Sequence, residues 1–429
     1  MLEGVETVLK ICVVGLGYIG LPAACLFADA GERVVGIDAS SERVALVNEG
    51  KQPFPEPGLE QILSRNVSAK RLRASTDYKE CKDADAVLLC LPTPITDKKM
   101  DSSFLRAACA SLAPRLRAGC LVVLESTVSP GTTRGFVREL LERGSGLKAG
   151  KDFFLAHCPE RAIPGNTLRE MRENERVVGG INAESAARAK KLYSLICKGE
   201  IAETNCTTSE FVKLAENIYR DVNIALANDF ALAAERLGVS VFDVVRLANK
   251  HPRVHLHAPG AGVGGHCIPL DSWFLMESYG DSRLLPLCRQ INDSMPLHAA
   301  RLLKQALGGG SLKGKKIVLL GVSFKPEIDD QRATPAEPLA LALKKEGAAV
   351  VAVDPFVKKC VFAELAPLDA AAEGADAVAI VTAHSAFQKI KWSDVRKKMR
   401  GNVIVDGRGV LKKAPEGFVL RGVGRGDLN

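Results

Sequence analysis

The stretch KICVVGLGYIG, from Lys10 to Gly20, decides the fold of the N-terminal part of this chain. Its first five residues are mostly apolar and β-branched, which is typical of a buried parallel strand. Its last six form a G-x-G-x-x-G turn, in which the glycines permit a tight turn, a close approach to a pyrophosphate, and close packing of helix on strand. We expect a helix over residues 21–30 and a second strand over 33–37, ending in Asp38. This order predicts a dinucleotide-binding domain; a purely structural glycine turn is the alternative.

Asp38 decides which dinucleotide is expected. An acid about twenty residues beyond the glycines can bind a ribose 2′-hydroxyl and would repel a 2′-phosphate, which favours NAD over NADP. Arg43 weakens this preference, because a nearby arginine can bind the 2′-phosphate of NADP; the alternative is that it lies over the adenine.

Two further strands are expected at residues 84–91 and 121–124, followed by Thr93 and Thr127. Ligands of open parallel sheets bind outside the carboxyl ends of the strands, so both threonines are expected at one crevice. An ordinary helix cap or turn is the alternative for each of them.

Another strand is expected at 153–156, followed by a loop over 157–166 with two prolines and a glycine. The loop carries a possible base, Glu160, and a cation, Arg161. By spacing alone, a solvated loop is as good an explanation as a functional one.

A helix pattern without a breaker runs from Thr207 to Gly238, about 30 residues or roughly 45 Å of helix. Thr207 and Glu210 predict a capping box at its start. Three polar residues share one of its faces, as a possible site or as plain solvated surface: Lys213, Asn217 and Arg220.

The α/β pattern then restarts, with strands expected at 317–321, 349–353 and from 375, and a helix at about 335–346. The turn Gly321–Pro326 lacks the glycine triplet, and Lys325 with Arg332 beyond it suits a differently placed phosphate. The fold class expected is α/β, with two Rossmann-like doubly wound domains joined by a long central helix and a small helical domain. The expected domains are a dinucleotide-binding domain at 1–205, a helical domain at 206–310, and a second nucleotide-binding domain at 311–429.

Between the two α/β parts, the segment Gly264–Asp271 sets Cys267 between a glycine pair and a proline. Irregular backbone of this kind can present a thiol, and a thiolate is a strong nucleophile toward a carbonyl carbon. The alternative is that Cys267 fills space as one of twelve cysteines.

Composition sets the outer bounds. The chain has 429 residues, 47% of them hydrophobic and 25% charged, with a formal charge of +8, which is typical of a globular protein of two or three domains. No apolar run approaches the ~20 residues of a membrane span, and residues 1–6 lack the order of a signal peptide. No two cysteines are spaced Cys-x-x-Cys, so no metal site is expected, and free thiols suit the cytoplasm. A compact anionic ligand explains the scattered basic residues at least as well as nucleic acid does, and neither a nucleic acid nor a membrane is expected as a partner.

The ordered motifs GLGYIG, PTP, ESTVSPGTT, PERAIPGN, Lys-x-x-x-Asn, GVGGHCIPLD and GVSFKP resemble the UDP-glucose/GDP-mannose dehydrogenase family. The resemblance extends from Gly15 through Arg332 and to the C-terminal part. It implies that residues 1–205 bind NAD, that residues 206–310 form a dimerisation domain with the catalytic cysteine loop, and that residues 311–429 bind the UDP-sugar. It implies oxidation of the C6 alcohol of a nucleotide sugar to a carboxylate, with two NAD and one water.

The resemblance also implies roles. Cys267 would capture an aldehyde as a thiohemiacetal, which the second oxidation converts to a thioester. Lys213 would act as a base or as a cation beside the oxyanion, and Asn217 as a hydrogen-bond donor. Asp271 would activate a water. The catalytic set is completed by Glu160, which would assist hydrolysis, and by Thr127.

The implied binding residues form two groups. The NAD contacts are Gly15, Gly17, Tyr18, Ile19, Gly20, Asp38, Arg43, Thr93, Thr127 and Arg332. The UDP-sugar contacts are Arg161, Ala162, Lys213, Asn217, Arg220, His251, Arg253, Gly264, Phe324 and Lys325. Arg253 is of the kind that the family offers across a dimer interface, so a homodimer or homotetramer is expected.

The expected substrate is UDP-N-acetyl-D-mannosamine, with UDP-N-acetylglucosamine as the alternative; Pro164 disfavours UDP-glucose because that branch has a second glutamate there. Two residues depart from the family pattern, Ala261 and Ser272, where proline is usual. Two other classes remain possible: a binding protein that has lost catalysis, which the intact catalytic set opposes, and a two-electron 3-hydroxyacid dehydrogenase. The latter leaves the second nucleotide domain unexplained.

Overall fold

The computed structural model describes residues 8–163 and 165–428; the N-terminal residues and Pro164, on which two expectations rest, lie outside this part. The chain divides into two compact units. Unit 1 comprises Met1–Glu216 and Trp273–Gly280, and unit 2 comprises Asn217–Ser272 and Asp281–Asn429. The three-way division by sequence range stays a prediction.

Unit 1 is built on an eight-stranded sheet of order β10-β9-β8-β7-β4-β1-β2-β3, in which only the β8–β9 pair is antiparallel. From β3 to β8 this is the strand order of a dinucleotide-binding fold. The bounds are β1 Lys10–Val14, β2 Arg33–Ile37, β3 Leu72–Ser75, β4 Ala86–Leu89, β7 Leu121–Leu124, β8 Phe154–His157, β9 Arg176–Gly180 and β10 Ile201–Asn205. A small antiparallel hairpin, β5 Ile95–Thr96 and β6 Lys99–Met100, lies apart from this sheet.

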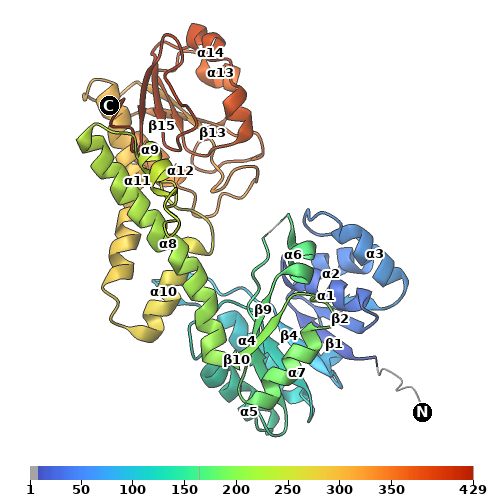
Figure 1. Ribbon diagram of the computed structural model, residues 1–429. Helices are drawn as coiled ribbons and strands as arrows, with labels where there is room; N and C mark the ends of the chain where they lie inside the picture. The colour runs from blue at the N-terminus through green and yellow to red at the C-terminus, as the bar shows by residue number, and fades with distance from the viewer. Residues whose placement is uncertain (1–7, 164, 429) are drawn as a thin grey trace. The chain divides into compact units, whose positions relative to one another are not determined.

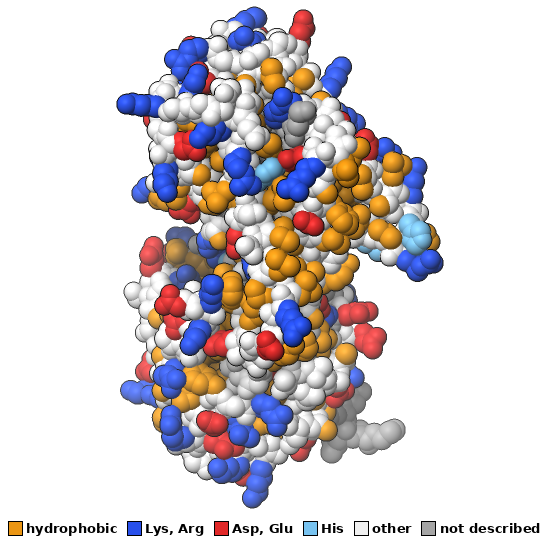
Figure 2. Space-filling model, turned by 90° about the vertical axis from the view of Figure 1, so that its left-hand side faces the viewer, with side chains coloured by type: hydrophobic (Ala, Val, Ile, Leu, Met, Phe, Trp, Pro, Cys, Tyr) orange, Lys and Arg blue, Asp and Glu red, His pale blue; other side chains and the backbone are white. Residues whose placement is uncertain are grey.

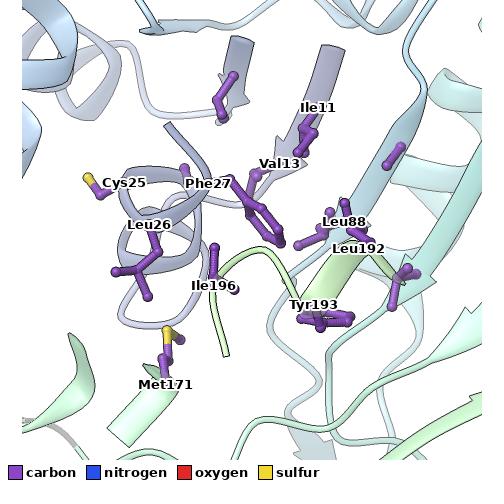
Figure 3. Packing of buried hydrophobic residues seen from close by; sticks show 14 of the residues in the cluster. Ile11, Val13, Cys25, Leu26, Phe27, Leu88, Met171, Leu192, Tyr193 and Ile196 are labelled. Carbon is purple, nitrogen blue, oxygen red and sulfur yellow. The ribbon is translucent and has the colours of Figure 1, made fainter. Parts of the chain in front are cut away.

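Helices cover both faces of this sheet (Figure 1). Successive strand residues point to opposite faces, so Ile11 and Val13 pack in one hydrophobic core while Cys12 and Val14 pack in the other. Figure 3 shows the first core, where Phe27 lies against Ile11, Val13 and Leu88, with Tyr193 at its edge. The helices are α1 Gly20–Asp29, α2 Ser41–Asn48, α3 Leu59–Ser68, α4 Ser103–Leu112, α5 Arg138–Ser145, α6 Thr167–Glu173 and α7 Ala183–Tyr193.

Unit 2 contains a second sheet, all parallel, of order β13-β12-β11-β14-β15-β16. This repeats the strand order of unit 1, which confirms the predicted second Rossmann-like domain and the α/β fold class. The strands are β11 Lys316–Leu320, β12 Ala349–Val353, β13 Glu364–Leu365, β14 Ala377–Ile380, β15 Val403–Asp406 and β16 Val419–Gly422. The helices around it are α9 Val241–Ala248, α11 Leu284–Ala306, α12 Ala336–Lys345, α13 Leu368–Ala372 and α14 Trp392–Lys398.

The long helix α8 spans Cys206–Leu237, 32 residues, as the unbroken pattern predicted. The predicted capping box is wrong. Asn205 caps the helix, because its Oδ1 accepts the N–H of Thr208 at 2.9 Å. Glu210 instead accepts the N–H groups of Gly131 and Thr133 at 2.6 and 2.7 Å, while the Thr207 hydroxyl is buried without a hydrogen-bond partner.

Candidate active site

The glycine turn of unit 1 has the shape that a pyrophosphate requires. Gly15 has φ +93°, and a Cβ there would lie 2.2 Å from the carbonyl oxygen of Cys90. A Cβ at Gly20 would lie 1.8 Å from the carbonyl oxygen of Gly15, so only glycine permits this packing. A Cβ at Gly17 would meet nothing within 4 Å. The turn therefore leaves open space beside the second glycine, where backbone can approach a ligand. Tyr18 and Ile19 complete this turn, and the ring of exposed Tyr18 lies 4.3 Å from that of Phe54.

Asp38 lies at the end of β2, directly beside this turn. Its Oδ2 accepts the N–H of Leu16 at 2.8 Å, and its Oδ1 accepts that of Ser40 at 2.9 Å. Arg43 forms an ion pair with the same Oδ2 at 2.9 Å. The structure thus shows Asp38 and Arg43, the two residues on which the expected choice between NAD and NADP rests, as one ion pair beside the glycine turn.

Thr93 and Thr127 are brought together, as the strand ends predicted. Strands β4 and β7 are parallel neighbours, and the Thr93 hydroxyl donates to the carbonyl oxygen of Thr127 at 2.7 Å. Ser126 reinforces this contact, since its hydroxyl accepts the N–H of Leu91 at 2.9 Å and donates to the Leu91 carbonyl at 2.7 Å. The two strand ends form one connected polar edge.

The loop after β8 is organised by Glu160. Its Oε1 accepts the N–H groups of Arg161 and Ala162 at 2.7 and 2.8 Å, and its Oε2 pairs with Arg176 at 2.8 Å. Both partners of the Glu160–Arg176 pair are buried. The Arg161 guanidinium is bonded to Glu216 and to the carbonyl of Glu175. These bonds hold Glu160 and Arg161 in place within unit 1, and a functional role for the loop stays a prediction.

A buried polar cluster beneath this loop was not found by sequence reasoning. Glu125, at the end of β7, accepts hydrogen bonds from Tyr193 and from the Cys90 thiol. Burial raises the pKa of Glu125, against the opposing effect of the nearby Arg176. Arg176 lies over the Tyr193 ring, 5.0 Å from its centroid. The sequence feature that could have indicated this cluster is Glu125, a carboxylate that directly follows the fully apolar strand β7.

In unit 2, Cys267 lies at the start of helix α10, Ile268–Tyr279, and is partly exposed. Its carbonyl accepts the N–H of Asp271 at 2.9 Å, which is the first bond of the helix. Its Sγ lies 3.1 Å from Nδ1 of His266. A helix N-terminus stabilises an anion, and an imidazole nitrogen can accept the thiol proton. His266 is a candidate site residue that sequence reasoning missed, although it directly precedes the cysteine.

Asp271 and Asn217 meet in the same unit. The amide nitrogen of Asn217 donates to Oδ2 of the buried Asp271 at 2.6 Å. Lys213 lies one turn earlier on α8 and Arg220 one turn later, so the predicted stripe is one face of that helix. Ser272, where proline is usual, donates to Asp221 at 3.2 Å, and Asp221 pairs with Arg289 at 2.6 Å.

The turn after β11 packs against the cysteine loop. The N–H of Gly265 donates to the carbonyl of Arg332 at 3.0 Å. A Cβ at Gly264 would lie 2.7 Å from Cβ of Phe324, so a side chain there would displace Phe324. Unit 2 thus brings together Cys267, Asp271, Asn217, Gly264, Phe324 and Arg332. Ala261, the other departure from the family pattern, donates its N–H to Gly407 at 2.9 Å, a bond that proline cannot make.

His251 and Arg253 lie in the exposed loop after α9. Among the described residues, neither side chain forms a hydrogen bond with the group around Cys267. The contact between them is local, from the N–H of Arg253 to Nδ1 of His251 at 3.4 Å.

Comparison with known families covers most of the chain. Residues 9–197 match the NAD-binding domain of the UDP-glucose/GDP-mannose dehydrogenase family, residues 207–294 its central domain, and residues 318–413 its UDP-binding domain. The chain belongs to this family. The family and the relatives of this chain make it an NAD-dependent UDP-sugar dehydrogenase, and the second sheet, which a 3-hydroxyacid dehydrogenase would leave unexplained, is the UDP-binding domain of the family.

Individual relatives agree. The chain is 41% identical over 423 residues to the UDP-N-acetyl-D-mannosamine dehydrogenase of Pyrococcus horikoshii, covering 98% of this chain and 100% of that one. A solved structure of the P. horikoshii enzyme has a TM-score of 0.92 at 40% identity, over 97% of this chain and 100% of that chain. The NDP-N-acetyl-D-galactosaminuronic acid dehydrogenase of Methanosarcina mazei has a TM-score of 0.91 at 37% identity, over 98% and 96%.

The cofactor of this dehydrogenase is NAD, and unit 1 fits it: the glycine turn leaves open space beside Gly17, and the carboxylate of Asp38 lies next to this turn. Within residues 8–163 and 165–428, no helix combines the length and apolar character that a membrane span requires.

Proposed function

We propose that this enzyme oxidises the C6 alcohol of UDP-N-acetyl-D-mannosamine to UDP-N-acetyl-D-mannosaminuronate, a four-electron reaction that passes through a thioester on Cys267. Support for the substrate comes from the similarity to enzymes named for it in Pyrococcus and Campylobacter. The observation that carries the covalent route is the place of Cys267 at a helix N-terminus, 3.1 Å from His266 and beside the Asn217–Asp271 pair.

Each catalytic group has a step. NAD, held by the glycine turn and Asp38, supplies a hydride acceptor for each of two oxidations. Lys213 takes the proton of the C6 hydroxyl during the first oxidation, which yields an aldehyde. The Cys267 thiolate then adds to the aldehyde carbon, and the resulting oxyanion is stabilised by Lys213 and by the Asn217 amide.

Loss of a second hydride from the thiohemiacetal leaves a thioester. Asp271 orients a water that attacks its carbonyl carbon, the thiolate leaves, and the product is a carboxylate. Both oxygens of Glu160 are already bonded within unit 1, so we propose that Glu160 assists hydrolysis by fixing the loop of Arg161 and Ala162 rather than by taking a proton.

The test is the number of NADH formed per sugar, with UDP-N-acetylmannosamine, UDP-N-acetylglucosamine and UDP-glucose each supplied in limiting amount. We expect two NADH for the first sugar. Two NADH only from UDP-N-acetylglucosamine would transfer the proposal to the alternative substrate. One NADH, or no turnover of any sugar, would remove the four-electron proposal.

Cys267→Ser tests the covalent step. We expect the two-NADH reaction to be lost while UDP binding remains, because the serine hydroxyl is not ionised near neutral pH and cannot replace the thiolate. Cys360→Ser is the matched control, since Cys360 is another partly exposed cysteine of unit 2 and we expect it to leave the stoichiometry unchanged. Full turnover by the Cys267 variant would exclude the thioester.

We also propose that the enzyme is a homodimer or homotetramer in the cytoplasm. Large apolar side chains are exposed on helices α8, α9 and α11, and Figure 2 shows hydrophobic side chains gathered on the side of the molecule that these helices occupy. Those of unit 2 include Tyr219, Leu226, Leu237, Leu247, Leu284, Leu287 and Leu297, each more than 40% exposed. Exposed apolar patches of this kind mark contact surfaces. All twelve cysteines are free thiols, which suits a reducing compartment.

A further inference from the structure

A buried histidine in unit 2 has no part in the chemistry above. His384 follows strand β14 and is 0% exposed. Its ring lies between two phenylalanines, 5.2 Å from the ring of Phe356 and 5.3 Å from that of Phe387. An imidazole buried at such a position must have both nitrogens hydrogen-bonded, because an unsatisfied polar group there is costly.

Both nitrogens are bonded, and the bonds define the protonation of the ring. Nδ1 accepts the backbone N–H of Glu327 at 3.0 Å, so it carries no proton. Nε2 then carries the proton and lies 3.1 Å from Oδ2 of Asp354 and 3.2 Å from Oγ of Ser323. Ser323, His384 and Asp354 do not form a nucleophilic triad, because serine and aspartate share one nitrogen and the serine is 1% exposed.

Asp354 is the counterpart of Asp38. Asp38 follows β2, which pairs with β1, and Asp354 follows β12, which pairs with β11. Asp38 accepts the N–H of Leu16 in the turn after β1, and Asp354 accepts the N–H of Val322 in the turn after β11, both at 2.8 Å. Asp354 additionally accepts the N–H of Phe356 and of Val357. Burial raises its pKa, but these bonds and that from His384 outweigh burial and leave the pKa at about 2. Both carboxylates are thus engaged within the protein, but the charged partner of Asp38 is Arg43, whereas Asp354 is paired with His384 and its side chain is 0% exposed.

The partner of His384 Nδ1 is a strained residue. Glu327 has φ +63°, a left-handed conformation that is unfavourable for a residue other than glycine. Its carboxylate accepts the N–H of Ser385 at 2.7 Å and the Ser385 hydroxyl at 3.1 Å. Glu327 is thus held from both sides by two consecutive residues, His384 and Ser385. Structure that over-determines a strained residue in this way is characteristic of functional loops.

The loop fixed by this contact is the one that carries Phe324 and Lys325. The Ser323 hydroxyl donates to the carbonyl of Lys325 at 2.9 Å, and the N–H of Phe324 donates to the carbonyl of Asp330 at 2.9 Å. His384 therefore contacts the loop at Ser323, before these two residues, and at Glu327, after them.

We propose that His384 is a positioning residue for uridine nucleotide binding: the neutral imidazole joins Asp354 to Glu327 and so fixes Phe324 and Lys325 in the conformation that binds the nucleotide. This proposal rests on the proposed function, in which these two residues contact the UDP-sugar.

The test separates the two hydrogen bonds of the ring. His384→Phe keeps the shape and removes both bonds, whereas the His384→Asn side-chain oxygen can still accept the N–H of Glu327. Glu327→Ala removes the contacts to Ser385 at an exposed side chain, where folding is not at risk. His298→Phe is the matched control, because His298 is also a largely buried histidine of unit 2 but pairs with Glu235 at 2.9 Å, away from the loop.

The readouts are the dissociation constants of UDP and of NADH, measured by calorimetry on the full chain, and hydrogen exchange of the Glu327 amide. We expect UDP binding to weaken by about tenfold in His384→Phe, the effect of about one lost hydrogen bond to a buried group. We expect changes of less than about threefold in His384→Asn and a detectable weakening in Glu327→Ala, with NADH binding unchanged throughout. Exchange of the Glu327 amide should accelerate in His384→Phe and not in His298→Phe.

UDP binding by His384→Phe at the wild-type affinity would overturn the positioning role. So would an equal loss of UDP binding in His298→Phe, or a parallel loss of NADH binding, because either would mean general destabilisation. Wild-type protein that binds NADH but not UDP would instead refute the proposed function, and the positioning role with it.

Discussion

At the scale of single residues, the Cys267 thiol is set apart from the other cysteines by its surroundings. Burial raises the pKa of Cys25 and that of Cys158, to about 12 for the latter, so these thiols stay protonated. Cys267 is partly exposed, lies at a helix N-terminus and has an imidazole 3.1 Å away. A helix N-terminus stabilises an anion, so this polar setting supports the proposal that Cys267, and not one of the buried cysteines, is the nucleophile.

His157 gives a prediction about pH. It lies in β8 with 0% exposure, its Nδ1 is 2.9 Å from the Ser209 hydroxyl, and its Nε2 is 3.3 Å from the Ser126 carbonyl. Burial lowers the pKa of His157 from 6.5 to about 4, outweighing the Ser126 bond, and the charge of Lys213 acts in the same direction. The unfolded chain therefore binds this proton at a higher pH than the folded chain does. Its contribution to stability is complete above pH 6.5 and is lost as the pH falls toward 4.

We expect this loss to be up to about 3 kcal/mol, the product of the shift and 1.36 kcal/mol per pH unit. His157→Gln, which cannot titrate, should flatten the fall in the free energy of unfolding between pH 6.5 and 4, measured by urea denaturation. His255→Gln, at an exposed position, is the control and should leave the curve unchanged. Parallel curves for wild type and His157→Gln would show that another group governs acid sensitivity.

At the scale of elements, the start of α8 shows which residue a helix uses as its cap. Asn205→Ala should lower the free energy of unfolding by about 1 kcal/mol, because it leaves the N–H of Thr208 without its acceptor. Thr207→Val should be neutral or stabilising, since its buried hydroxyl has no hydrogen-bond partner. The measurement is thermal or urea unfolding of both variants. A larger loss for the Thr207 variant would restore the capping box that the sequence suggested.

The burial of a strand explains part of what could be predicted from the sequence at this scale. Central strands such as β1, β2, β7 and β12 were predicted with their observed bounds, because strands buried on both faces are continuous apolar runs. Edge strands such as β10, Ile201–Asn205, were missed, since an edge strand is partly solvated and its pattern is broken by polar residues. Two interior strands, β9 Arg176–Gly180 and β15 Val403–Asp406, were missed as well. The approach of Thr93 to Thr127 followed from the positions of the strand ends. The hydrogen bond between Asn217 and Asp271 was not predicted, although both residues were assigned to the site. The clusters around Glu125 and His384 were not predicted either, because their members are distant in sequence.

At the scale of the whole molecule, helices α8, α9 and α11 expose large apolar side chains that a partner could cover. Leu284 and Leu287 are each 55% exposed on α11, and Leu237 on α8 is 75% exposed. Fully burying a leucine contributes about 1.5–3 kcal/mol, so a set of such residues is unfavourable in water and favourable at an interface. A second copy of the chain is the occupant that we propose.

Leu284→Glu combined with Leu287→Glu should therefore shift the oligomer toward monomer, because two buried charges at the interface would lack partners. Light scattering coupled to size-exclusion chromatography measures the mass against 45.9 kDa per chain. Leu341→Glu is the matched control, since Leu341 on α12 is 53% exposed and lies outside these helices; it should keep the wild-type mass. If Arg253 contributes to a neighbouring subunit's site, the monomeric double variant should also lose turnover while retaining NADH binding. A wild-type protein that is already monomeric would refute the oligomer, and a monomer with full turnover would show that each chain completes its own site.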